Sequence, residues 1–268
     1  MKIIRFLSDD GRILYGEYKL EFRELADIIT GDIFHDFIVT SEKARIKRFL
    51  PPIEPVNILA MGLNYRRHAE ETGASFPEYP VLFMKSTTSV IGHQDSILLP
   101  ASGAEMVDYE AELAIVIGKT AKNLNIKEAM DYILGYTCAN DVSARDWQLG
   151  KQKGQWIRAK SFDTFCPLGP WLVTADEIVD PNNLRIRTLL NDFTVLQDSN
   201  TSNMIFNVAA IISFLSQSMT LLPGTIILTG TPEGVGFTRK PPLFLKAGDR
   251  ITIEIEGLGQ LSNSVVME

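Results

Sequence analysis

Alternating hydrophobic and polar positions predict that most of this chain folds as β-strands. At the start, two apolar stretches at 2–7 and 12–19 flank an Asp-Asp-Gly turn, which is typical of a hairpin. The strongest strand signal lies at 109–117, where β-branched residues are frequent and Gly118 follows. Weaker apolar stretches predict further strands at 56–61, 81–85, 225–229 and 250–256.

Helical spacing of apolar residues is restricted to a few short stretches. One surrounds Leu25 and Ile29 in the N-terminal part. A second is expected at 125–135, where Asn125 and Glu128 come close to a capping box. Both stretches are short, so helices are expected to contribute little to the fold.

A third helix is expected to start after Thr201 or Ser202 and to end before Pro223. The polar segment 62–73 is predicted to form a turn and a short helix. Strands thus outnumber helices, and they do not alternate with them as they would in a doubly wound fold. The sequence therefore predicts a β-rich α+β fold with a mixed or antiparallel sheet system.

Prolines divide the chain into a small and a large part. Pro51, Pro52 and Pro55 cannot continue a helix, and each restricts the residue before it, so 51–55 is interpreted as a linker. We expect a small N-terminal domain of residues 1–52 and a larger domain of residues 53–268.

Composition and charge exclude several classes of protein. With 45% hydrophobic and 22% charged residues, the chain is expected to be globular. Its net charge is -7 and it has no basic run, so we expect no nucleic-acid partner. No apolar stretch approaches the roughly 18 residues of a membrane span, and the start lacks a signal peptide, so we expect no membrane association and a cytoplasmic protein. Cys138 and Cys166 lack metal or redox spacing and are expected to be buried and reduced.

Two glutamates in the strongest strand form a candidate metal site. Glu110 and Glu112 are two residues apart, so their side chains leave the same face of the strand. Taken alone, this spacing fits a solvated strand face equally well. Asp141, at the end of another apolar segment, would complete a set of three carboxylates for a hard divalent cation. With few histidines and no cysteine pattern, Mg²⁺ or Mn²⁺ fits better than zinc.

His68 lies in a dense polar segment with Glu71 three residues further on. One helical turn would bring the two side chains together, and an acid that orients a histidine is how a general base is prepared. The alternative is a surface helix with an incidental charge pair.

Further polar residues follow Asp141. Arg145, Gln148 and Lys160 would suit a substrate with carboxylate and carbonyl oxygens, although an ordinary charged loop would contain the same residue types. The segment TGTPEGVG at 229–236 has the glycines of an anion-binding turn, but no Gly-Lys-Ser/Thr of a Walker loop follows it.

Six segments in order resemble the fumarylacetoacetate hydrolase superfamily: GLNYRRHAEE, DYEAELAIVIGK, GYTCANDVSARDWQ, RAKSFDTFCPLGPW, LNDFTVLQDSNTSNMIF and PGTIILTGTPEGVG. The resemblance extends from about residue 58 to the C-terminus. It implies a mixed β-roll catalytic domain with few helices, preceded by a small N-terminal α/β domain as in bacterial two-domain members. It also implies a homodimer.

The resemblance also implies roles for individual residues. It makes Glu110, Glu112 and Asp141 the ligands of Mg²⁺ or Mn²⁺. It makes His68, Glu71 and Lys160 catalytic, with the first two on a segment that orders over substrate. Arg145, Gln148 and Thr231 become substrate-binding residues. Leu63 stands where many relatives have Arg, so a substrate contact made by that Arg is expected to be absent.

The implied chemistry is cleavage or proton transfer through a metal-stabilised enolate of a 2-keto acid. Hydrolysis of a C–C bond in an acylpyruvate, such as fumarylpyruvate or acetylpyruvate, is expected first. Oxaloacetate decarboxylation and 2-hydroxyhepta-2,4-diene-1,7-dioate isomerisation are alternatives, because the same enolate serves all three. Outside this chemistry stand an inactive metal-binding homologue and a phosphate-binding transferase built on the segment 229–236.

Overall fold

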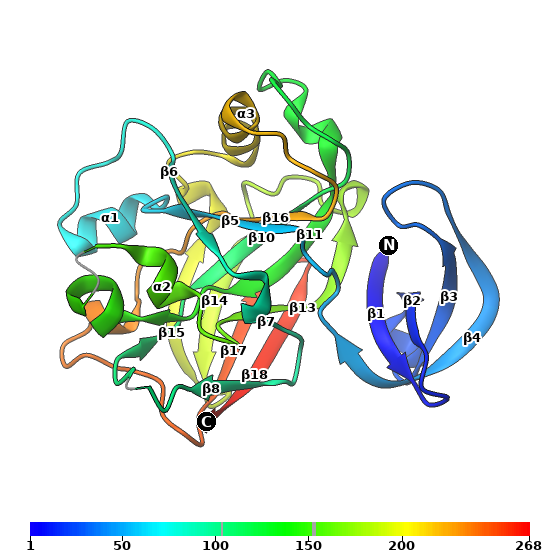
Figure 1. Cartoon of the computed structure of the whole chain (residues 1–268), viewed down its shortest axis with the longest axis horizontal. Helices are drawn as coiled ribbons and strands as arrows, with labels where there is room; N and C mark the ends of the chain where they lie inside the picture. The colour runs from blue at the N-terminus through cyan, green and yellow to red at the C-terminus, as the bar shows by residue number, and fades with distance from the viewer. Residues whose placement is uncertain (103, 152–153) are drawn as a thin grey trace.

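The computed structural model describes residues 1–102, 104–151 and 154–268. An eleven-stranded mixed sheet runs through the described part of the chain, with the strand order β2-β3-β4-β1-β13-β11-β10-β16-β5-β6 and β7 beside β13 (Figure 1). Its strands are β1 Lys2–Ser8, β2 Ile13–Tyr18, β3 Leu25–Gly31, β4 Phe37–Leu50, β5 Asn57–Gly62, β6 Val81–Lys85, β7 Val90–Ile91, β10 Ala111–Ile117, β11 Ile133–Asn140, β13 Cys166–Thr174 and β16 Thr225–Leu228.

A second sheet has the order β15-β14-β17-β18-β8, and β12 pairs with β9 in a two-stranded sheet. These strands are β8 Ser96–Leu99, β9 Val107–Asp108, β12 Ser143–Ala144, β14 Arg185–Leu190, β15 Thr194–Asn200, β17 Arg250–Ile255 and β18 Gly259–Met267. The helices are α1 Arg66–Thr72, α2 Trp156–Lys160, α3 Val208–Ser218 and the π-helix η4 Asp146–Lys151. Short 3₁₀ turns are η1 Leu20–Phe22, η2 Thr87–Ser89, η3 Ala129–Tyr132, η5 Ala175–Glu177, η6 Thr201–Asn203 and η7 Gly236–Thr238. The strand-rich mixed-sheet fold is confirmed.

Strand β10 lies at the centre of the molecule. All seven of its residues are buried, and it pairs with β11 on one side and β16 on the other. Leu113 and Ile115 face a core that also contains the apolar face of α3, while Ala114 and Val116 face the core on the opposite side of the sheet. A strand covered on both faces is held in one register, which fixes the direction of every side chain along it.

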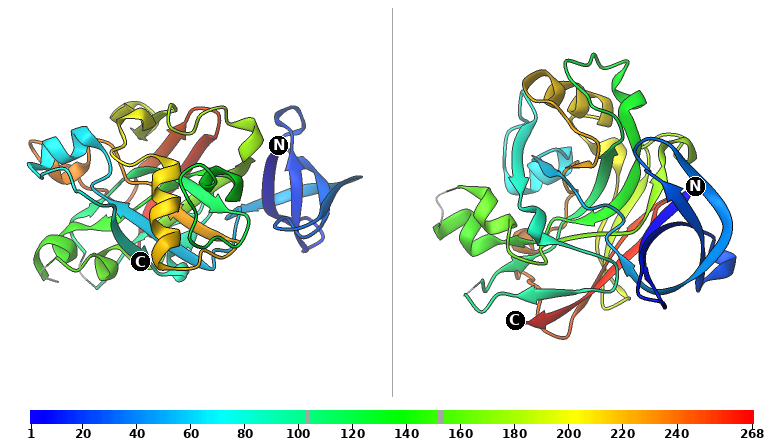
Figure 2. Two further views of the ribbon diagram at one scale, coloured as in Figure 1. Left: turned by 90° about the horizontal axis from the view of Figure 1, so that it is seen from above. Right: turned by 45° about the vertical axis from the view of Figure 1, so that its right-hand side comes forward.

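The N-terminal strands form a separate lobe beside the body, as the two further views make clear (Figure 2). Strands β1 to β4 enclose their own small core around Ile4, Phe6 and Tyr18. Pairing of β1 with β13 joins this lobe to the large sheet. Residues 51–55 lie between β4 and β5 without regular structure. The domain boundary after residue 52 stays a prediction.

The helix expected around Leu25 and Ile29 is wrong, because these residues belong to β3. Ile28 packs in the core of the lobe and Ile29 packs against the body, so both faces of the strand are apolar. Consecutive apolar residues of this kind imitate helical spacing. The lobe is therefore built of strands with one 3₁₀ turn, and the expected α/β mixture is corrected.

Two other helix predictions were only partly right. At 125–135 the Asn125 side chain accepts hydrogen bonds from the N–H groups of Lys127 and Glu128, as a cap should, but only the 3₁₀ turn η3 follows before β11 begins. The third helix, α3, begins at Val208 with Asn207 as its cap, and Thr201 starts only the 3₁₀ turn η6. In both places the sequence indicated where a helical turn starts, but the length of the helix depends on tertiary packing.

The expectations for the cysteines and for membrane association can also be compared with the structure. Cys138 and Cys166 are free and buried, as expected. In the described part of the chain, none of the helices combines the length and apolarity needed to span a bilayer.

Candidate active site

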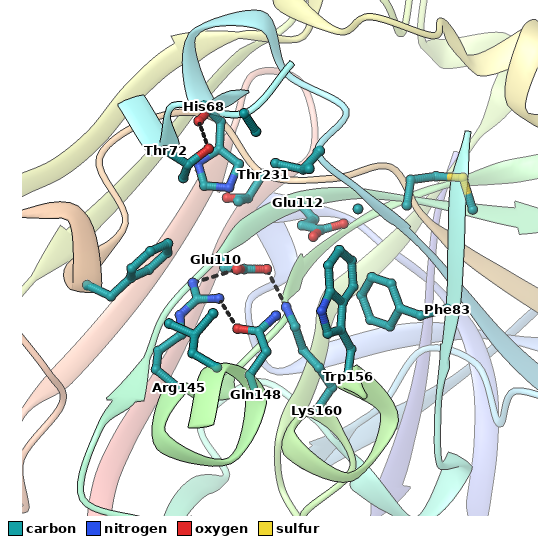
Figure 3. Close-up of a pocket in the computed structure, with 16 residues that line it drawn as sticks. His68, Thr72, Phe83, Glu110, Glu112, Arg145, Gln148, Trp156, Lys160 and Thr231 are labelled. Atoms are coloured by element: carbon teal, nitrogen blue, oxygen red, sulfur yellow. Dashed lines mark hydrogen bonds and ion pairs between the residues drawn. The ribbon is translucent and has the colours of Figure 1, made fainter. Parts of the chain in front are cut away.

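A pocket of about 270 Å³ opens between α1, α2, η4 and the end of the central sheet (Figure 3). Charged and polar side chains from several elements meet in it, and apolar side chains close the remaining wall. It is lined by Met61, Gly62, Leu63, His68, Thr72, Ala74, Phe83, Glu110, Glu112, Arg145, Gln148, Leu149, Trp156, Lys160, Thr231 and Phe237. Seven of the nine predicted site residues thus line one pocket, and the other two lie directly behind it.

Glu110, Glu112 and Asp141 come together at the base of the pocket. Each offers one oxygen, and these oxygens all lie within 4.8 Å of one another. The two glutamates share a face at the start of β10, and the antiparallel neighbour β11 ends next to them, so that Asp141 follows its last residue. The N–H group of Asp141 donates to the carbonyl of Glu110 at 2.9 Å, which holds the two chain segments together.

The charges of this cluster are unevenly balanced. Burial penalises the ionised form of Glu110, but the cations Lys160 and Arg145 outweigh it and lower the pKa to about 2. For Glu112, burial and the neighbouring charges of Asp141 and Glu110 together raise the pKa well above its usual value. Glu112 is therefore the carboxylate of the cluster whose ionised form its surroundings stabilise least.

Three buried cations surround the carboxylates. Lys160 donates from Nζ to Glu110 Oε2 and to Asp141 Oδ2, both at 2.6 Å. Lys85 donates to the other oxygen of Asp141 at 2.5 Å. Arg145 donates from Nη2 to Glu110 Oε1 at 2.6 Å. Glu110 and Asp141 are consequently fixed in orientation, which is the condition for a preorganised ligand set.

The residues present fit a hard divalent cation. All donors in the cluster are carboxylate oxygens, which are the ligands that Mg²⁺ and Mn²⁺ prefer. The raised pKa of Glu112 supports the same assignment, because a cation placed among the three oxygens would supply the missing positive charge.

His68 and Glu71 form the expected pair on α1. His68 Nδ1 lies 2.8 Å from Glu71 Oε1, and the His68 side chain is only 9% exposed. Since Nδ1 is engaged by the carboxylate, Nε2 is the ring nitrogen left for a ligand in the pocket. The ring lies above Thr231 and Glu112 in Figure 3.

The turn after β16 contacts both the carboxylate cluster, at Glu112, and the acid–base pair, at Glu71. Gly230 N donates to Glu112 Oε2 at 2.7 Å, and Gly234 N lies 3.1 Å from both oxygens of Glu71. Burial raises the pKa of Glu71, but the hydrogen bonds from His68 and Gly234 outweigh it and lower the pKa overall. Because these N–H groups already bind carboxylates of the protein, the turn does not offer them to a phosphate, which argues against the transferase reading.

Thr231 and Gln148 line the pocket, and each is hydrogen-bonded to a neighbouring side chain. The amide of Gln197 donates to Thr231 Oγ1 at 2.9 Å, so the Thr231 hydroxyl keeps its own proton as a donor toward the pocket. Gln148 Oε1 accepts from Arg145 Nη1 at 2.7 Å, which orients the amide beside the guanidinium.

An aromatic wall closes one side of the pocket. Trp156 packs edge-on against Phe83 with ring centroids 5.3 Å apart. A Cβ at Gly62 would lie 2.2 Å from the Trp156 ring, so only glycine lets the ring approach the backbone. Leu63, the departure from many relatives, also lines the pocket and has a positive φ of 49°.

Several residues that build the site escaped sequence analysis. Lys85 ends an apolar strand, Asp108 precedes the glutamate motif, and Gln197 lies in an edge strand, and none carries a local signal of its role. Trp156 and Phe237 resemble ordinary core residues. Trp156 shares one face of α2 with Lys160, four residues later, which is the signal that could have identified it.

Comparison with known proteins gives a consistent result. Residues 57–266 match the family described as fumarylacetoacetate (FAA) hydrolase C-terminal. A curated relative named oxaloacetate tautomerase fahd2, mitochondrial, from Xenopus laevis is 50% identical over 224 residues, which is 84% of this chain and 70% of the relative.

Among the similar solved structures are two isomerases that each cover all of this chain. One is a 5-carboxymethyl-2-hydroxymuconate delta-isomerase from Mycobacterium smegmatis, 40% identical with a TM-score of 0.88 over 100% of that chain. The other is a 2-hydroxyhepta-2,4-diene-1,7-dioate isomerase from Mycobacterium marinum, 41% identical with a TM-score of 0.85 over 99% of that chain.

Proposed function

The chain belongs to the fumarylacetoacetate hydrolase family, and from that premise we propose that it transfers a proton to or from the enolate of a 2-keto acid. The proton would be exchanged at carbon 3 in a keto–enol tautomerisation, or at carbon 5 of the dienolate when a conjugated double bond migrates. The names of the Xenopus tautomerase and of the two mycobacterial isomerases support this class of reaction. They match the alternatives drawn from the sequence, while acylpyruvate hydrolysis, which was expected first, stays a prediction.

One observation carries the proposal: an acid–base pair and a cluster of charge-stabilising groups line the same pocket. His68 lines one side, while Lys160 and Arg145 line the other (Figure 3). Proton removal next to a carbonyl requires a base on the carbon and positive charge near the oxygen that becomes an enolate. The pocket provides both.

Glu110, Glu112 and Asp141 would hold the divalent metal, which we propose to be Mg²⁺ or Mn²⁺. When bound, the metal supplies electrophilic stabilisation of the negative charge that develops on the enolate.

The residues of the chain have separate tasks. Arg145, Gln148 and the Thr231 hydroxyl bind and orient the carboxylate of the substrate. Burial lowers the pKa of Lys160, but Asp141 and Glu110 outweigh it and raise the pKa overall, so Lys160 stays cationic and stabilises charge rather than acting as a base. His68 accepts and returns the proton at Nε2, and Glu71 fixes the ring through Nδ1.

Hydrolysis of an acylpyruvate is the second candidate. The observation in its favour is the same His68–Glu71 pair, because a base of this kind can also activate water. The apolar wall formed by Trp156 and Phe83 would then face the acyl group. An inactive metal-binding homologue is disfavoured, since His68, Glu71 and Lys160 are all present and lie at or directly behind the pocket.

A substrate panel separates these functions. The purified chain, with Mg²⁺, with Mn²⁺ and with chelator, is given enol-oxaloacetate, the heptadienedioate and acetylpyruvate, and the products are followed by NMR. We expect faster ketonisation or double-bond migration, dependent on metal, without release of a carboxylic acid. Cleavage of acetylpyruvate as the only accelerated reaction would instead establish the hydrolase, and metal binding without any reaction would establish an inactive homologue.

Two further expectations from the sequence are retained as proposals. We propose a homodimer, to be tested by sedimentation or light scattering, and a cytoplasmic location. The Xenopus relative, by contrast, is named as mitochondrial.

A further inference from the structure

Asp108 lies next to the pocket, outside both the carboxylate cluster and the pocket wall. It is wholly buried at the end of β9. Strand β9 pairs with β12, and Arg145 directly follows β12 in the chain. Its side chain collects four donors: Tyr109 N at 2.8 Å, Gly236 N at 2.7 Å, Phe237 N at 3.1 Å and Arg145 Nε at 2.8 Å. A buried carboxylate with this many donors fixes whatever donates to it.

Arg145 is the first group that Asp108 fixes. With Nε on Asp108, Nη1 on Gln148 and Nη2 on Glu110, each nitrogen of the guanidinium has a protein partner. Its carbon also lies 4.4 Å from the centre of the Phe237 ring. The planar guanidinium is thereby held by three acceptors along its edges, and its rotation would break these contacts.

The turn 234–238 is the second group that Asp108 fixes. Gly236 is pressed against Asp108 so closely that a Cβ there would lie 2.5 Å from Asp108 Oδ1 and 1.9 Å from the Leu243 carbonyl oxygen. Two residues earlier, Gly234 N holds Glu71, and Tyr109 OH donates to Gly234 O at 3.1 Å. One end of this turn therefore rests on Asp108, and the other end supports the acid of the acid–base pair.

We propose that Asp108 is a positioning residue that couples the proposed substrate-binding residue Arg145 to the acid–base pair His68–Glu71. It does so because it holds both Arg145 and the turn 234–238 in place. The proposal deepens the proposed function and rests on it for the roles of Arg145 and Glu71. Substrate binding at Arg145 and orientation of His68 through Glu71 then depend on one carboxylate that contacts neither substrate nor the catalytic histidine.

Asp108→Asn is the direct test. Asparagine keeps the shape of the side chain but replaces one oxygen with an NH₂ group, which cannot accept a hydrogen bond. In one orientation the NH₂ group faces Phe237 N and Arg145 Nε. In the reversed orientation it faces Gly236 N. Calorimetry with oxalate, a planar dianion similar to a pyruvate enolate, is performed on the Mn²⁺-loaded protein. We expect oxalate affinity to fall roughly tenfold with Mn²⁺ affinity unchanged. Asp27→Asn, which removes a buried acid in the N-terminal lobe, is the matched control and should change neither.

A double-mutant cycle then tests the coupling. In an Arg145→Met background, Asp108→Asn should weaken oxalate binding by less than about twofold, because its effect passes through Arg145. In a Glu71→Gln background, Asp108→Asn should likewise lower kcat by a smaller factor than it does in the wild-type protein. Losses that simply multiply in both backgrounds would overturn the proposal, as would unchanged oxalate affinity in folded Asp108→Asn protein.

A second variant keeps the test decisive if Asp108→Asn does not fold. Arg145→Lys retains a cation but removes the Nε donor to Asp108 and the stacking on Phe237. We expect it to shift the acidic limb of the pH profile of kcat, although Arg145 touches neither His68 nor Glu71, and an unmoved limb would contradict the coupling. The oxalate measurements do not require turnover, so they can support the positioning of Arg145 even if the proposed reaction fails.

Discussion

At the scale of single residues, the site is a balance of buried charges. Four carboxylates, Asp108, Glu110, Glu112 and Asp141, are buried together with the cations Lys85, Arg145 and Lys160 among the described residues. Removing one member of a buried ion pair is costly because its partner stays charged in a poorly solvated place. A divalent cation changes the sign of this balance, so an anionic substrate is expected to bind well only after the metal.

Lys160→Met is expected to separate metal binding from turnover. The ammonium lies between Glu110 and Asp141, so its loss removes positive charge close to the proposed cation. Mn²⁺ affinity, measured by calorimetry, should be unchanged or higher, while turnover falls about 10²-fold because enolate charge is less stabilised. Glu112→Gln serves as the opposite control, since it should weaken Mn²⁺ binding. Full turnover by Lys160→Met would refute the charge-stabilising role.

Local sequence predicted the members of the site better than their environment. Glu110 and Glu112 were found because a strand places alternate residues on one face, and His68 with Glu71 because a helical turn joins them. Lys85, Asp108 and Gln197 were not found because their partners are distant in sequence and meet them only after the sheets have formed. The raised pKa of Glu112 likewise depends on Asp141, which another strand supplies.

At the scale of elements, strands were predicted better than helices. β6 and β10 were identified from apolar stretches nearly as they occur, whereas β3, covered on both faces, imitated a helix. The π-helix η4 and α2, which carry Gln148 and Lys160, gave no periodic signal because each is only one or two turns long. They are positioned by the ion pairs and aromatic contacts of the site itself.

The contact between α1 and the turn 234–238 has a predictable pH dependence. The Glu71 pKa lies below its ordinary value of 4.5, so ionised Glu71 stabilises the folded protein above that pH, and the contribution disappears as the pH falls through the lower folded-state value. Thermal denaturation should therefore show Glu71→Gln to be less stable than wild type at neutral pH, with the difference shrinking in acid. Glu70→Gln, on the exposed side of α1, should show no such trend. A difference that grows toward low pH would contradict the ionised pair.

At the scale of the whole molecule, one sheet links the N-terminal lobe to the active site. β1 pairs with β13, β13 with β11, and β11 ends beside Asp141. The site is consequently built on strongly buried strands, and in the described part of the chain α1, α2, η4 and the turns contribute its parts outside the sheets. The resemblance of six ordered segments predicted the strand-rich fold of the body through the family that it implies, because the sheet order cannot be worked out from the order of segments along the chain.

Labelling of the two cysteines with a thiol reagent measures how readily this central sheet opens. Cys138 lies in β11 and Cys166 in β13, both without exposure, and burial raises the pKa of Cys166 to about 12. Because the reactive species is the thiolate, a thiol reagent at mildly alkaline pH should label neither residue in the native protein and both in denaturant. Rapid labelling of native protein would mean that the sheet opens far more readily than its packing indicates.

The most direct measurement is the rate at which enol-oxaloacetate is converted to the keto form by wild-type protein and by His68→Ala, both loaded with Mn²⁺. If His68 is the proton-transferring base over a charge-stabilising cluster, the variant should bind Mn²⁺ and oxalate as wild type does and lose about 10²- to 10⁴-fold in rate. Wild-type ketonisation by His68→Ala, in protein that still binds both ligands, would contradict it.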